Sequence, residues 1–595
     1  MLPPSSTVSK FKAIKFDSES FRRFKFAALG TLFVCTASLI VLFDPIAQIV
    51  KDQLSIREGS LLFYLFKSPP LEVFISVYVF NVTNVEAFLN KEDSKLKLQE
   101  VGPYVYREFL EHTNYTFNSN GTLTYFPKRT VQFIPERSIG DPKIDIVTVP
   151  NIPYLGASSA AAEMSVFAAL ALSTLTATIN SQPMLNLTVD DYLWGYDDPL
   201  VKLAANVIPS IITFESFGLL DRMFDEGSNA VTMNLPQQVE LQRRETEKQL
   251  NVPHTEPKYD NGDENFSNNF IDSELMNMAE SLYQKDTHET SHETYKPQIR
   301  DYSIDSWNGL AGLDYWGYSN NEKDGSKNTV CNTLRGTYDG TLFPQNISQN
   351  EEFRVYRKAF CRTLPIRFDH AGEIDGLQAY YFELTENAFD SDVVDPSSSC
   401  FCPKGKCLRK GLGNITPCYY NIPAAVSYPH FYRSDPTLLD EVDGLQPNAE
   451  KHGSEIVLQP QLGVPMRVHS RLQINLLLDK TKFNSRVKPF DNIVLPIVWL
   501  EISVERLTPG LIVLLHLLFN ILPYVQVGLV CLLCVLGVSL FAVAAISHCF
   551  SATSRNEYSP KRDVKQSAIY WFPYIKKEFE KYTDAEHKYQ IGCEV

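Results

Sequence analysis

The 595-residue sequence predicts an α+β membrane protein, in which a β-rich body with a helical cluster is flanked by two transmembrane helices. Three observations predict this class. A charge-free apolar stretch lies near each end of the chain, segments rich in Val, Ile, Tyr and Phe recur between the two stretches, and an Ala-rich segment interrupts them. The net charge of −15 disfavours a nucleic-acid-binding protein, because phosphates require a basic face.

The first transmembrane helix is predicted over residues 26–43, which are 18 residues without a charge. Basic residues dominate the segment before it: Lys10, Lys12, Lys15, Arg22, Arg23 and Lys25, against Asp17 and Glu19. Positive residues stay on the cytoplasmic side, so residues 1–25 are expected to be a cytosolic tail. A cleaved signal peptide is the alternative, which we disfavour because the apolar run is long and no small-x-small site follows it directly.

The second transmembrane helix is predicted over residues 525–546, within a charge-free stretch that runs from Thr508 to Ser554. Arg555, Lys561, Arg562 and Lys565 follow, so residues 547–595 are expected to be a second cytosolic tail. Residues 509–524 are interpreted as a membrane-proximal segment, with a helix over Gly510 to Leu522. Residues 44–508 then form the ectodomain.

Two features of residues 44–508 agree with a luminal or extracellular side. N-glycosylation sequons occur at Asn81, Asn114, Asn120, Asn186, Asn265, Asn346 and Asn414. Six cysteines lie there as well, and an even number in an oxidising compartment indicates three disulfides: Cys331, Cys361, Cys400, Cys402, Cys407 and Cys418. Spacing alone leaves 15 pairings open. Zinc is the alternative, which the absence of paired C-x2-C spacing disfavours.

Within the ectodomain, runs of β-branched and aromatic residues predict strands. The predicted strands are Val73–Val82, Val131–Pro135, Ala379–Leu384, Ile456–Leu458, Leu472–Leu478 and Ile493–Ser503. The Ala-rich segment Ser158–Thr178 predicts a helix, and Asp190–Leu193 and Leu200–Ile208 are further helical candidates. Residues 240–305 hold 15 acidic and 7 basic residues and few apolar ones, which predicts an exposed, partly disordered insertion.

One enzymatic motif occurs in that insertion, H-E-x-x-H at His288 to His292. In zinc proteases this spacing places two histidines on one helical face, with the glutamate activating water. Here the surroundings are polar and Pro297 follows, so no buried helix is expected and we interpret the match as coincidental. No nucleophile elbow or phosphate-binding loop occurs. We therefore expect a non-enzyme without catalytic residues, metal or cofactor.

Several ordered motifs resemble the scavenger receptor class B family, which includes platelet glycoprotein IV, the lysosomal integral membrane protein type 2 and the sensory neuron membrane proteins. The resemblance covers roughly residues 26–550 and rests on these motifs: YVFNVTN at 78–84, VGPYVYRE at 101–108, LWGYDDP at 193–199, PHFYRSDP at 429–436, RLQIN at 471–475 and LPIVWLE at 495–501. It implies a large antiparallel β-barrel-like ectodomain with an apical helical bundle and an apolar tunnel. It also implies the disulfides Cys331–Cys400, Cys361–Cys418 and Cys402–Cys407.

The function implied by the resemblance is binding of lipid or lipoprotein ligands and passage of lipid through the tunnel to the membrane. The alternative is an adhesion, signalling or sorting receptor for a protein ligand. Residues 151–201 contain no Lys or Arg, so the apex is expected to be acidic and to suit neutral lipids or a basic protein partner. We expect the plasma membrane, with a lysosomal or endosomal membrane as the alternative. Cys549 is a palmitoylation candidate, and the oligomeric state stays open, a homo-oligomer included.

Overall fold

The computed structural model describes residues 18–556 apart from 211, 226, 237–294, 296 and 321–326. Within these residues the chain forms two compact units, one within residues 1–47 and 522–595 and the other within residues 48–521. The larger unit is called the body here. Most of the acidic insertion, with its sequon at Asn265 and the motif at His288 to His292, lies outside the described residues.

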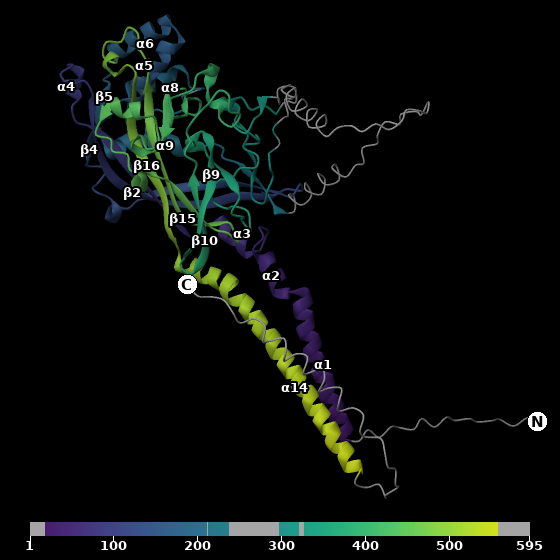
Figure 1. Ribbon diagram of the computed structural model, residues 1–595. Coiled ribbons are helices and arrows are strands. Elements are labelled where there is room, and N and C mark those ends of the chain that lie inside the picture. Colours follow the sequence, from purple (N-terminus) through teal and green to yellow (C-terminus); the bar gives the residue numbers. More distant parts are fainter. Residues whose placement is uncertain are drawn as a thin grey trace, which may run out of the picture. The chain divides into compact units, whose positions relative to one another are not determined.

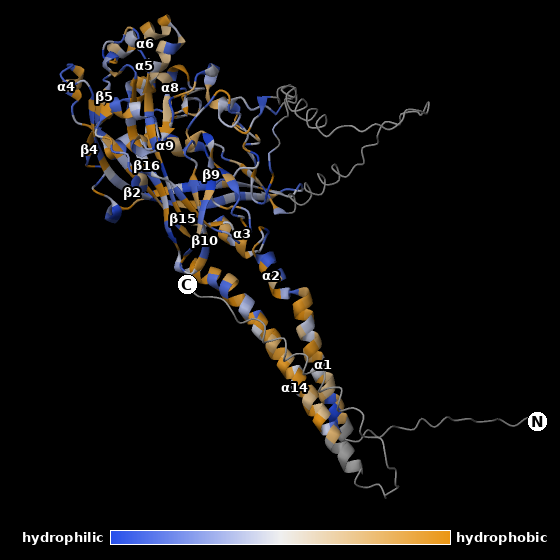
Figure 2. Cartoon of the chain, in the orientation of Figure 1, coloured by the Kyte–Doolittle hydropathy of each residue, from blue (hydrophilic) through white to orange (hydrophobic). Residues whose placement is uncertain are grey.

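The smaller unit contains two helices, α1 (Ser18–Phe43) and α14 (Leu522–Asn556), which enclose the predicted spans. Both are long and apolar enough to cross a membrane (Figure 2). Gly30 and Gly537 let their backbones approach closely. A Cβ atom on Gly30 would lie 3.0 Å from the carbonyl oxygen of Gly537, and one on Gly537 would lie 2.6 Å from Cγ2 of Val34. Small residues at such contacts are typical of helix pairs in membranes.

The body is built on a 14-stranded, mainly antiparallel sheet (Figure 1). Its path runs through β7 (Ile304–Trp307), β6 (Val231–Asn234), β3 (Thr122–Phe133), β2 (Leu96–Phe117), β1 (Leu71–Val82), β16 (Ile493–Leu507), β15 (Val464–Leu478), β14 (Glu455–Gln459), β10 (Leu377–Leu384), β9 (Arg362–Ile374) and β8 (Glu352–Arg357). Three short strands lie off this path: β11 (Gly413–Asn414), β12 (Ala424–Ser427) and β13 (Val442–Asp443). All six predicted strands fall on strands of this sheet, except that Ile134 and Pro135 lie beyond β3.

A short segment joins the two ends of the sheet. On the β7 side, the Gly336 N–H donates to Ile304 O at 2.9 Å, and the Ile304 N–H donates to Thr337 O at 2.7 Å. On the β8 side, Tyr338 donates to Arg354 O and accepts from Tyr356 N at 2.9 and 2.8 Å. Because β7 and β8 are the first and last strands of the path, these bonds close the sheet into a barrel. The predicted barrel-like fold is therefore confirmed.

The inner face of the barrel is mostly apolar. One row of directly paired residues crosses five neighbouring strands: Val468, Val504, Val73, Glu108 and Val131. Alternate residues of β1 and β16 on this face, such as Ile75, Val77 and Leu500, are buried. Four of the five residues in the row are valines, so Glu108 is the exception.

A helical cluster covers one end of the barrel (Figure 1). It contains α5 (Ile152–Met164), α6 (Val166–Thr178), α7 (Val189–Trp194), α8 (Pro199–Val207) and α9 (Leu219–Phe224). The predicted helix Ser158–Thr178 is two helices, because Ser165 is extended and its hydroxyl caps α6 by accepting from the Ala168 N–H. The Ser159 hydroxyl ties α5 to the end of β15 by donating to Leu477 O at 3.2 Å.

The opposite end of the barrel carries α13 (Pro509–Leu515) and a π-helix, η11 (His516–Ile521). Ile493, the first residue of β16, pairs with Leu478 at the end of β15, beside the helical cluster. Both α13 and η11 follow the last residue of β16 and therefore lie at the other end of the barrel. His516 Nε2 lies 2.8 Å from Asp375 O, and the Asn520 amide donates to Gly376 O at 3.2 Å. The β9–β10 turn therefore holds this segment, which the sequence predicts as one helix.

The remaining elements connect or flank the barrel. The helices are α2 (Pro45–Gln53), α3 (Leu61–Lys67), α4 (Val85–Leu89) and α12 (Ala449–His452). Strands β4 (Ile146–Pro150) and β5 (Met184–Thr188) form a separate antiparallel pair, and short 3-10 turns fill many of the loops.

Candidate functional site

An apolar cavity of about 40 Å³ lies under the helical cluster. Its walls come from α9, β12, β15, β16 and the loop before β12, and include Ile152, Met223, Ala424, Ile474, Leu476 and Ile497. Among the described lining residues, Arg222 is the one charged side chain. Its guanidinium forms ion pairs with Asp221 and Asp225 and lies 4.3 Å from the ring centroid of Phe214. The two carboxylates therefore neutralise the Arg222 charge beside the cavity, and the surface of the cavity is apolar.

A second group of cavities lies at the opposite end of the barrel. A cavity of about 90 Å³ is lined by residues of β1, β2, β8, β15 and β16 and adjoins one of about 50 Å³ that is lined by α3 and by Leu511 of α13. An open pocket of about 370 Å³ shares Pro69, Leu71, Glu108 and Leu110 with the first of them. Because β8 and β2 contribute to one cavity from distant places in the strand order, this cavity lies inside the barrel.

Side chains fill the space between the two groups. Val79, Val498 and Leu500 on β1 and β16 are nearly or fully buried. The described cavity under the helical cluster shares no lining residue with those at the opposite end. A continuous tunnel therefore stays a prediction, and passage between the cavities requires these side chains to move.

Charged groups are buried at the end of the barrel opposite the helical cluster. The Arg129 Nε–H donates to Oε1 of Glu108 at 3.1 Å, and Nη1 of Arg357 lies 4.0 Å from the same oxygen. His112 is nearby, and its Nδ1 lies 2.6 Å from Phe66 O. Burial lowers the pKa of His112 to about 4. Sequence analysis missed this cluster, because nothing in the strand pattern distinguishes Glu108 from a surface carboxylate.

The tip of the helical cluster is apolar, which the sequence analysis also missed. Met164, Val166, Phe167 and Leu170 are exposed, with Phe167 84% exposed, and α6 carries no charged residue. The sequence of α6 lacks the polar face that a surface helix normally has, and this feature could have indicated the apolar tip.

The acidic residues of the helical cluster have local structural roles. Asp198 is buried and caps α8 by accepting from the N–H groups of Leu200 and Val201. Asp191 accepts from the Thr188 hydroxyl at 2.7 Å, and Asp197 pairs with Lys202 at 2.9 Å. These carboxylates favour helix N-termini, where they meet unpaired N–H groups. Of these three residues, Asp198 is a helix cap, whereas Asp191 and Asp197 are bound by Thr188 and Lys202.

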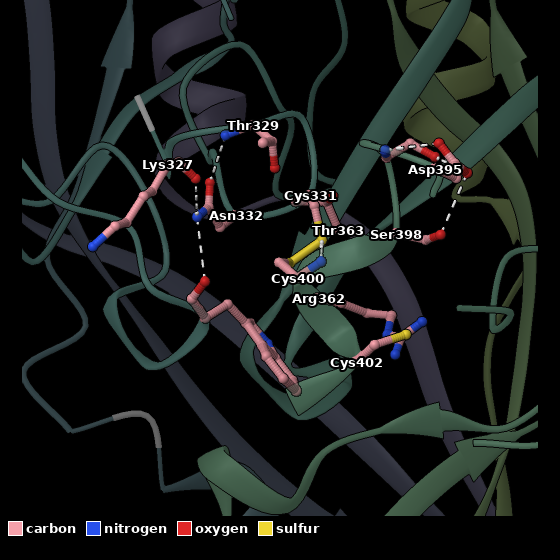
Figure 3. Close-up of a disulfide and its surroundings, with 12 residues drawn as sticks. Lys327, Thr329, Cys331, Asn332, Arg362, Thr363, Asp395, Ser398, Cys400 and Cys402 are labelled. Carbon is pink, nitrogen blue, oxygen red and sulfur yellow. Dashed lines mark hydrogen bonds between the residues drawn. A yellow bond between two sulfur atoms is a disulfide. The ribbon is translucent and has the colours of Figure 1, made fainter. Parts of the chain in front are cut away.

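The structure forms three disulfides, Cys331–Cys400, Cys361–Cys418 and Cys402–Cys407, which is the pairing that the resemblance implies. Sulfur atoms in disulfides do not act as zinc-binding thiolates, so this arrangement favours disulfides over the zinc alternative. Figure 3 shows Arg362 beside Cys331, Cys400 and Cys402. Its guanidinium lies 3.9 Å from the ring centroid of Phe401, and burial lowers the pKa of Arg362 to about 9.

The motif at 429–436 is held by a hydrogen-bond network on the outside of the barrel. Oε2 of Glu100 accepts from Trp499 Nε1 at 2.7 Å and lies 2.6 Å from Nε2 of His430. The Gln446 N–H donates to His430 Nδ1, so the neutral ring carries its proton on Nε2 and donates to Glu100. Burial raises the pKa of Glu100, but the bonds from His430 and Trp499 outweigh it and lower the pKa.

The sequon asparagines differ in exposure. Asn114, Asn120, Asn186 and Asn346 are exposed and Asn81 is half-buried, whereas Asn414 is only 7% exposed. Its amide oxygen also accepts from the Thr416 N–H at 2.9 Å. The burial of Asn414 argues against a glycan there, and glycosylation at the other sites stays a prediction. Cys549 is exposed on α14, and its palmitoylation also stays a prediction.

Together, the two candidate spans, the closed disulfide-bonded barrel and its internal apolar cavities define a membrane protein with one large folded body between its two membrane helices. The chain belongs to the CD36 family, whose sequence model matches residues 28–548. This confirms the resemblance seen in the motifs.

Curated relatives support the same assignment. Scavenger receptor class B member 1 of Bos taurus is 28% identical over 514 residues, covering 85% of this chain and 86% of that protein. The Mus musculus protein of the same name is 28% identical over 479 residues, covering 80% and 79%. Lysosome membrane protein 2 of Homo sapiens is 27% identical over 461 residues, covering 77% and 80%. The chain is therefore a scavenger-receptor-type membrane protein.

Proposed function

We propose that the body binds lipid or lipoprotein ligands at its helical end and passes lipid through the barrel to the membrane. The physical need is to keep the lipid tail away from water. Each buried methylene is worth about 0.8 kcal/mol, so exposing a 16-carbon chain costs about 12 kcal/mol. An apolar interior removes most of that barrier without a chemical step. The observation that carries the proposal is that one closed barrel has an apolar cavity under its helical end and a largely apolar cavity, lined also by Glu108 and Arg357, at its other end.

The apolar tip of α5 and α6 supports loading from a neutral lipid surface. Phe167 and Met164 are 84% and 78% exposed, and exposed apolar clusters of this kind mark sites of interaction with membranes, lipids or proteins. Residues 151–201 hold no Lys or Arg. A basic residue of another loop lies beside them, however, since Arg486 donates to Asn180 Oδ1 and Ser181 O at 3.2 and 3.0 Å. The exposed apolar side chains, and not a lack of basic groups, therefore indicate a neutral lipid surface. We therefore favour neutral lipid surfaces as ligands.

The opposite end is proposed to deliver lipid to the bilayer. Leu511 of α13 lines one of its cavities, and the chain continues from there through η11 into the candidate span α14. We propose that both termini are cytosolic and that residues 44–508 lie outside the cell or in an organelle lumen. The plasma membrane is the favoured location, with a lysosomal or endosomal membrane as the alternative.

A plug in the upper cavity tests transport separately from binding. Ala424 lines the cavity and is 7% exposed, so Ala424→Leu fills space that lipid would use. Cells expressing the full-length variant should bind fluorescent neutral lipid particles normally and take up less of their lipid. Ala449→Leu, at an exposed position of α12, is the matched control.

Normal surface expression and an unchanged melting temperature would establish that Ala424→Leu folds, since overpacking typically costs about 1–3 kcal/mol. Uptake that is equal in the wild type and in Ala424→Leu would contradict passage through this cavity. Particle binding without protein-dependent uptake in the wild type would favour the alternative, an adhesion or sorting receptor that does not transport lipid.

A further inference from the structure

One carboxylate interrupts an apolar row inside the barrel. Val468, Val504, Val73, Glu108 and Val131 pair directly across β15, β16, β1, β2 and β3, so their side chains share one face. This is the inner face, because Val73, Val504 and Glu108 line the same cavity as Arg357 of β8. The Glu108 side chain is only 1% exposed. A charge rarely occupies such a position unless its hydrogen bonds are satisfied.

The Glu108 carboxylate is only half satisfied. Oε1 accepts from Arg129 Nε at 3.1 Å, and Arg357 Nη1 lies 4.0 Å from it. Oε2 is buried and has no hydrogen-bond partner among the residues that the structure describes. A buried acceptor without a donor costs about 1–3 kcal/mol, and more for a charged group. Oε2 is therefore available to a hydrogen-bond donor that enters the cavity.

The cavity beside Glu108 has the shape and chemistry of a site for an amphiphile. Its volume is about 90 Å³, and Arg357 lines it together with Glu108. The other lining residues are mostly apolar and include Leu71, Val73, Leu110, Val468, Ile502 and Val504. Pro69, Leu71 and Thr341 also line the adjoining cavity of about 50 Å³. A small polar group can therefore lie at Glu108 while the carbon chain follows apolar surface.

We propose that this cavity binds the hydroxyl group of a neutral, hydroxyl-bearing lipid, which donates a hydrogen bond to Oε2 of Glu108. This rests on the proposed function, since the ligand reaches the site inside the barrel. A hydroxyl supplies the donor that the oxygen lacks. A methyl ether has the same chain but no donor, and an ionised fatty-acid carboxylate only accepts hydrogen bonds, so it cannot donate to Oε2. Glu108 is then a specificity-determining residue within the lipid path.

The test is photoaffinity labelling of the full-length protein in detergent with 1-hexadecanol that carries a diazirine near its hydroxyl group. The account predicts labelling of peptides from the cavity walls, such as those holding Leu71 and Ile502. Unlabelled 1-hexadecanol should compete roughly ten-fold or more better than hexadecyl methyl ether or palmitate, because a hydrogen bond to a charged group is worth about 1.5–3 kcal/mol.

Two variants connect this preference to the carboxylate. Glu108→Gln should weaken the preference for the alcohol. The double variant Glu108→Leu with Arg129→Met removes both charges and should abolish it while the barrel stays folded, since apolar replacement of a buried pair is often neutral. Glu373→Gln, exposed on β9, should leave it unchanged.

The outcomes separate this inference from the proposed function. Equal competition by alcohol and ether, or a preference that survives in the double variant, would overturn the hydroxyl site while leaving the lipid path intact. Labelling at the helical-end cavity but not at Glu108 would do the same. No specific labelling anywhere in the barrel would count against both the site and the path.

Discussion

Arg129 and Glu108 form an ion pair inside the barrel, with Arg129 Nε 3.1 Å from Oε1 of Glu108 and side chains that are 7% and 1% exposed. They come from the paired strands β3 and β2, in which Arg129 stands opposite Leu110 and Glu108 opposite Val131. Both side chains are thus on the inner face. In a buried ion pair each charge has lost its hydration, so removal of one partner destabilises the fold.

Removing one partner is therefore expected to destabilise the body. Arg129→Met should lower the free energy of unfolding by up to about 3–5 kcal/mol, since it leaves Glu108 with the longer contact to Arg357 alone, at 4.0 Å. The double variant with Glu108→Leu should recover most of that loss. Thermal melting of the full-length protein in detergent measures both. A double variant no more stable than Arg129→Met would show that the pairing is not the cause.

The contact between α1 and α14 gives a second prediction. A Cβ on Gly537 would lie 2.6 Å from Cγ2 of Val34 and 3.1 Å from the carbonyl oxygen of Gly30. Gly537→Leu should therefore force the helices apart. Gly528→Leu on the same helix is the matched control, because a Cβ there meets nothing within 4 Å.

Crosslinking measures the change in the helix pair. The Gln526 amide donates to Asp44 at 3.0 Å, so cysteines at these two positions should form a disulfide in the parent protein and with Gly528→Leu. With Gly537→Leu the yield should fall severalfold. Equal yields in the two glycine variants would refute the close approach of the two backbones.

Acid should destabilise the body through His112. Burial lowers the pKa of His112 to about 4, from about 6.5 in the unfolded chain. Between these values the unfolded state binds a proton that the folded state excludes, so stability falls as the pH drops from 6.5 towards 4. At pH 5 the loss from this residue is about 2 kcal/mol.

Unfolding measured at pH 7 and pH 5 tests this sign. His112→Gln is less stable at both values but should show a smaller drop on acidification than the wild type. His370→Gln, exposed on β9, should keep the full drop. A drop that is the same in His112→Gln and the wild type would assign the acid sensitivity to other groups, such as His452, whose pKa burial also lowers to about 4.

The apolar tip of the helical cluster predicts a loading surface. Phe167→Glu should weaken binding of the full-length protein to neutral lipid particles about ten-fold, since burying a phenylalanine contributes about 1.5–3 kcal/mol. Val394→Glu changes an equally exposed apolar side chain, 86% exposed and outside the helical cluster. Flotation of protein with particles gives the affinity. Equal losses in both variants would indicate a general effect of charge instead of a specific surface.

The sequence predicted the elements whose patterns are local. The two spans, six of the sixteen described strands and the helical segments follow from apolar runs, β-branched residues and alanine content. β2 was missed because its 22 residues, Leu96–Phe117, include Gly, Pro and several charges, which interrupt the run of β-branched and aromatic residues that predicts a strand. The break between α5 and α6 depends on one side chain, Ser165, whose capping role was not separable from the Ala-rich run.

The candidate site depends on residues that meet only in the folded chain. Closure of the barrel by Thr337 and Tyr338 brings β7 and β8 together, which no local pattern encodes. In the sequence, Glu108 is one of several charged residues in its segment. Its place on the inner face becomes evident only from the strand pairing, which aligns it with four valines. Asn414 matches a sequon, yet it is buried on β11. The resemblance of the motifs to a family predicted the barrel and the disulfide pairing, which the local patterns did not.

The most direct test of the lipid path is transfer by the purified full-length protein in liposomes. Fluorescent neutral lipid is supplied in donor particles, and its appearance in the liposome membrane is followed without any energy source. We expect protein-dependent transfer that Ala424→Leu lowers severalfold and Ala449→Leu leaves unchanged. Transfer no faster than into protein-free liposomes would contradict the account.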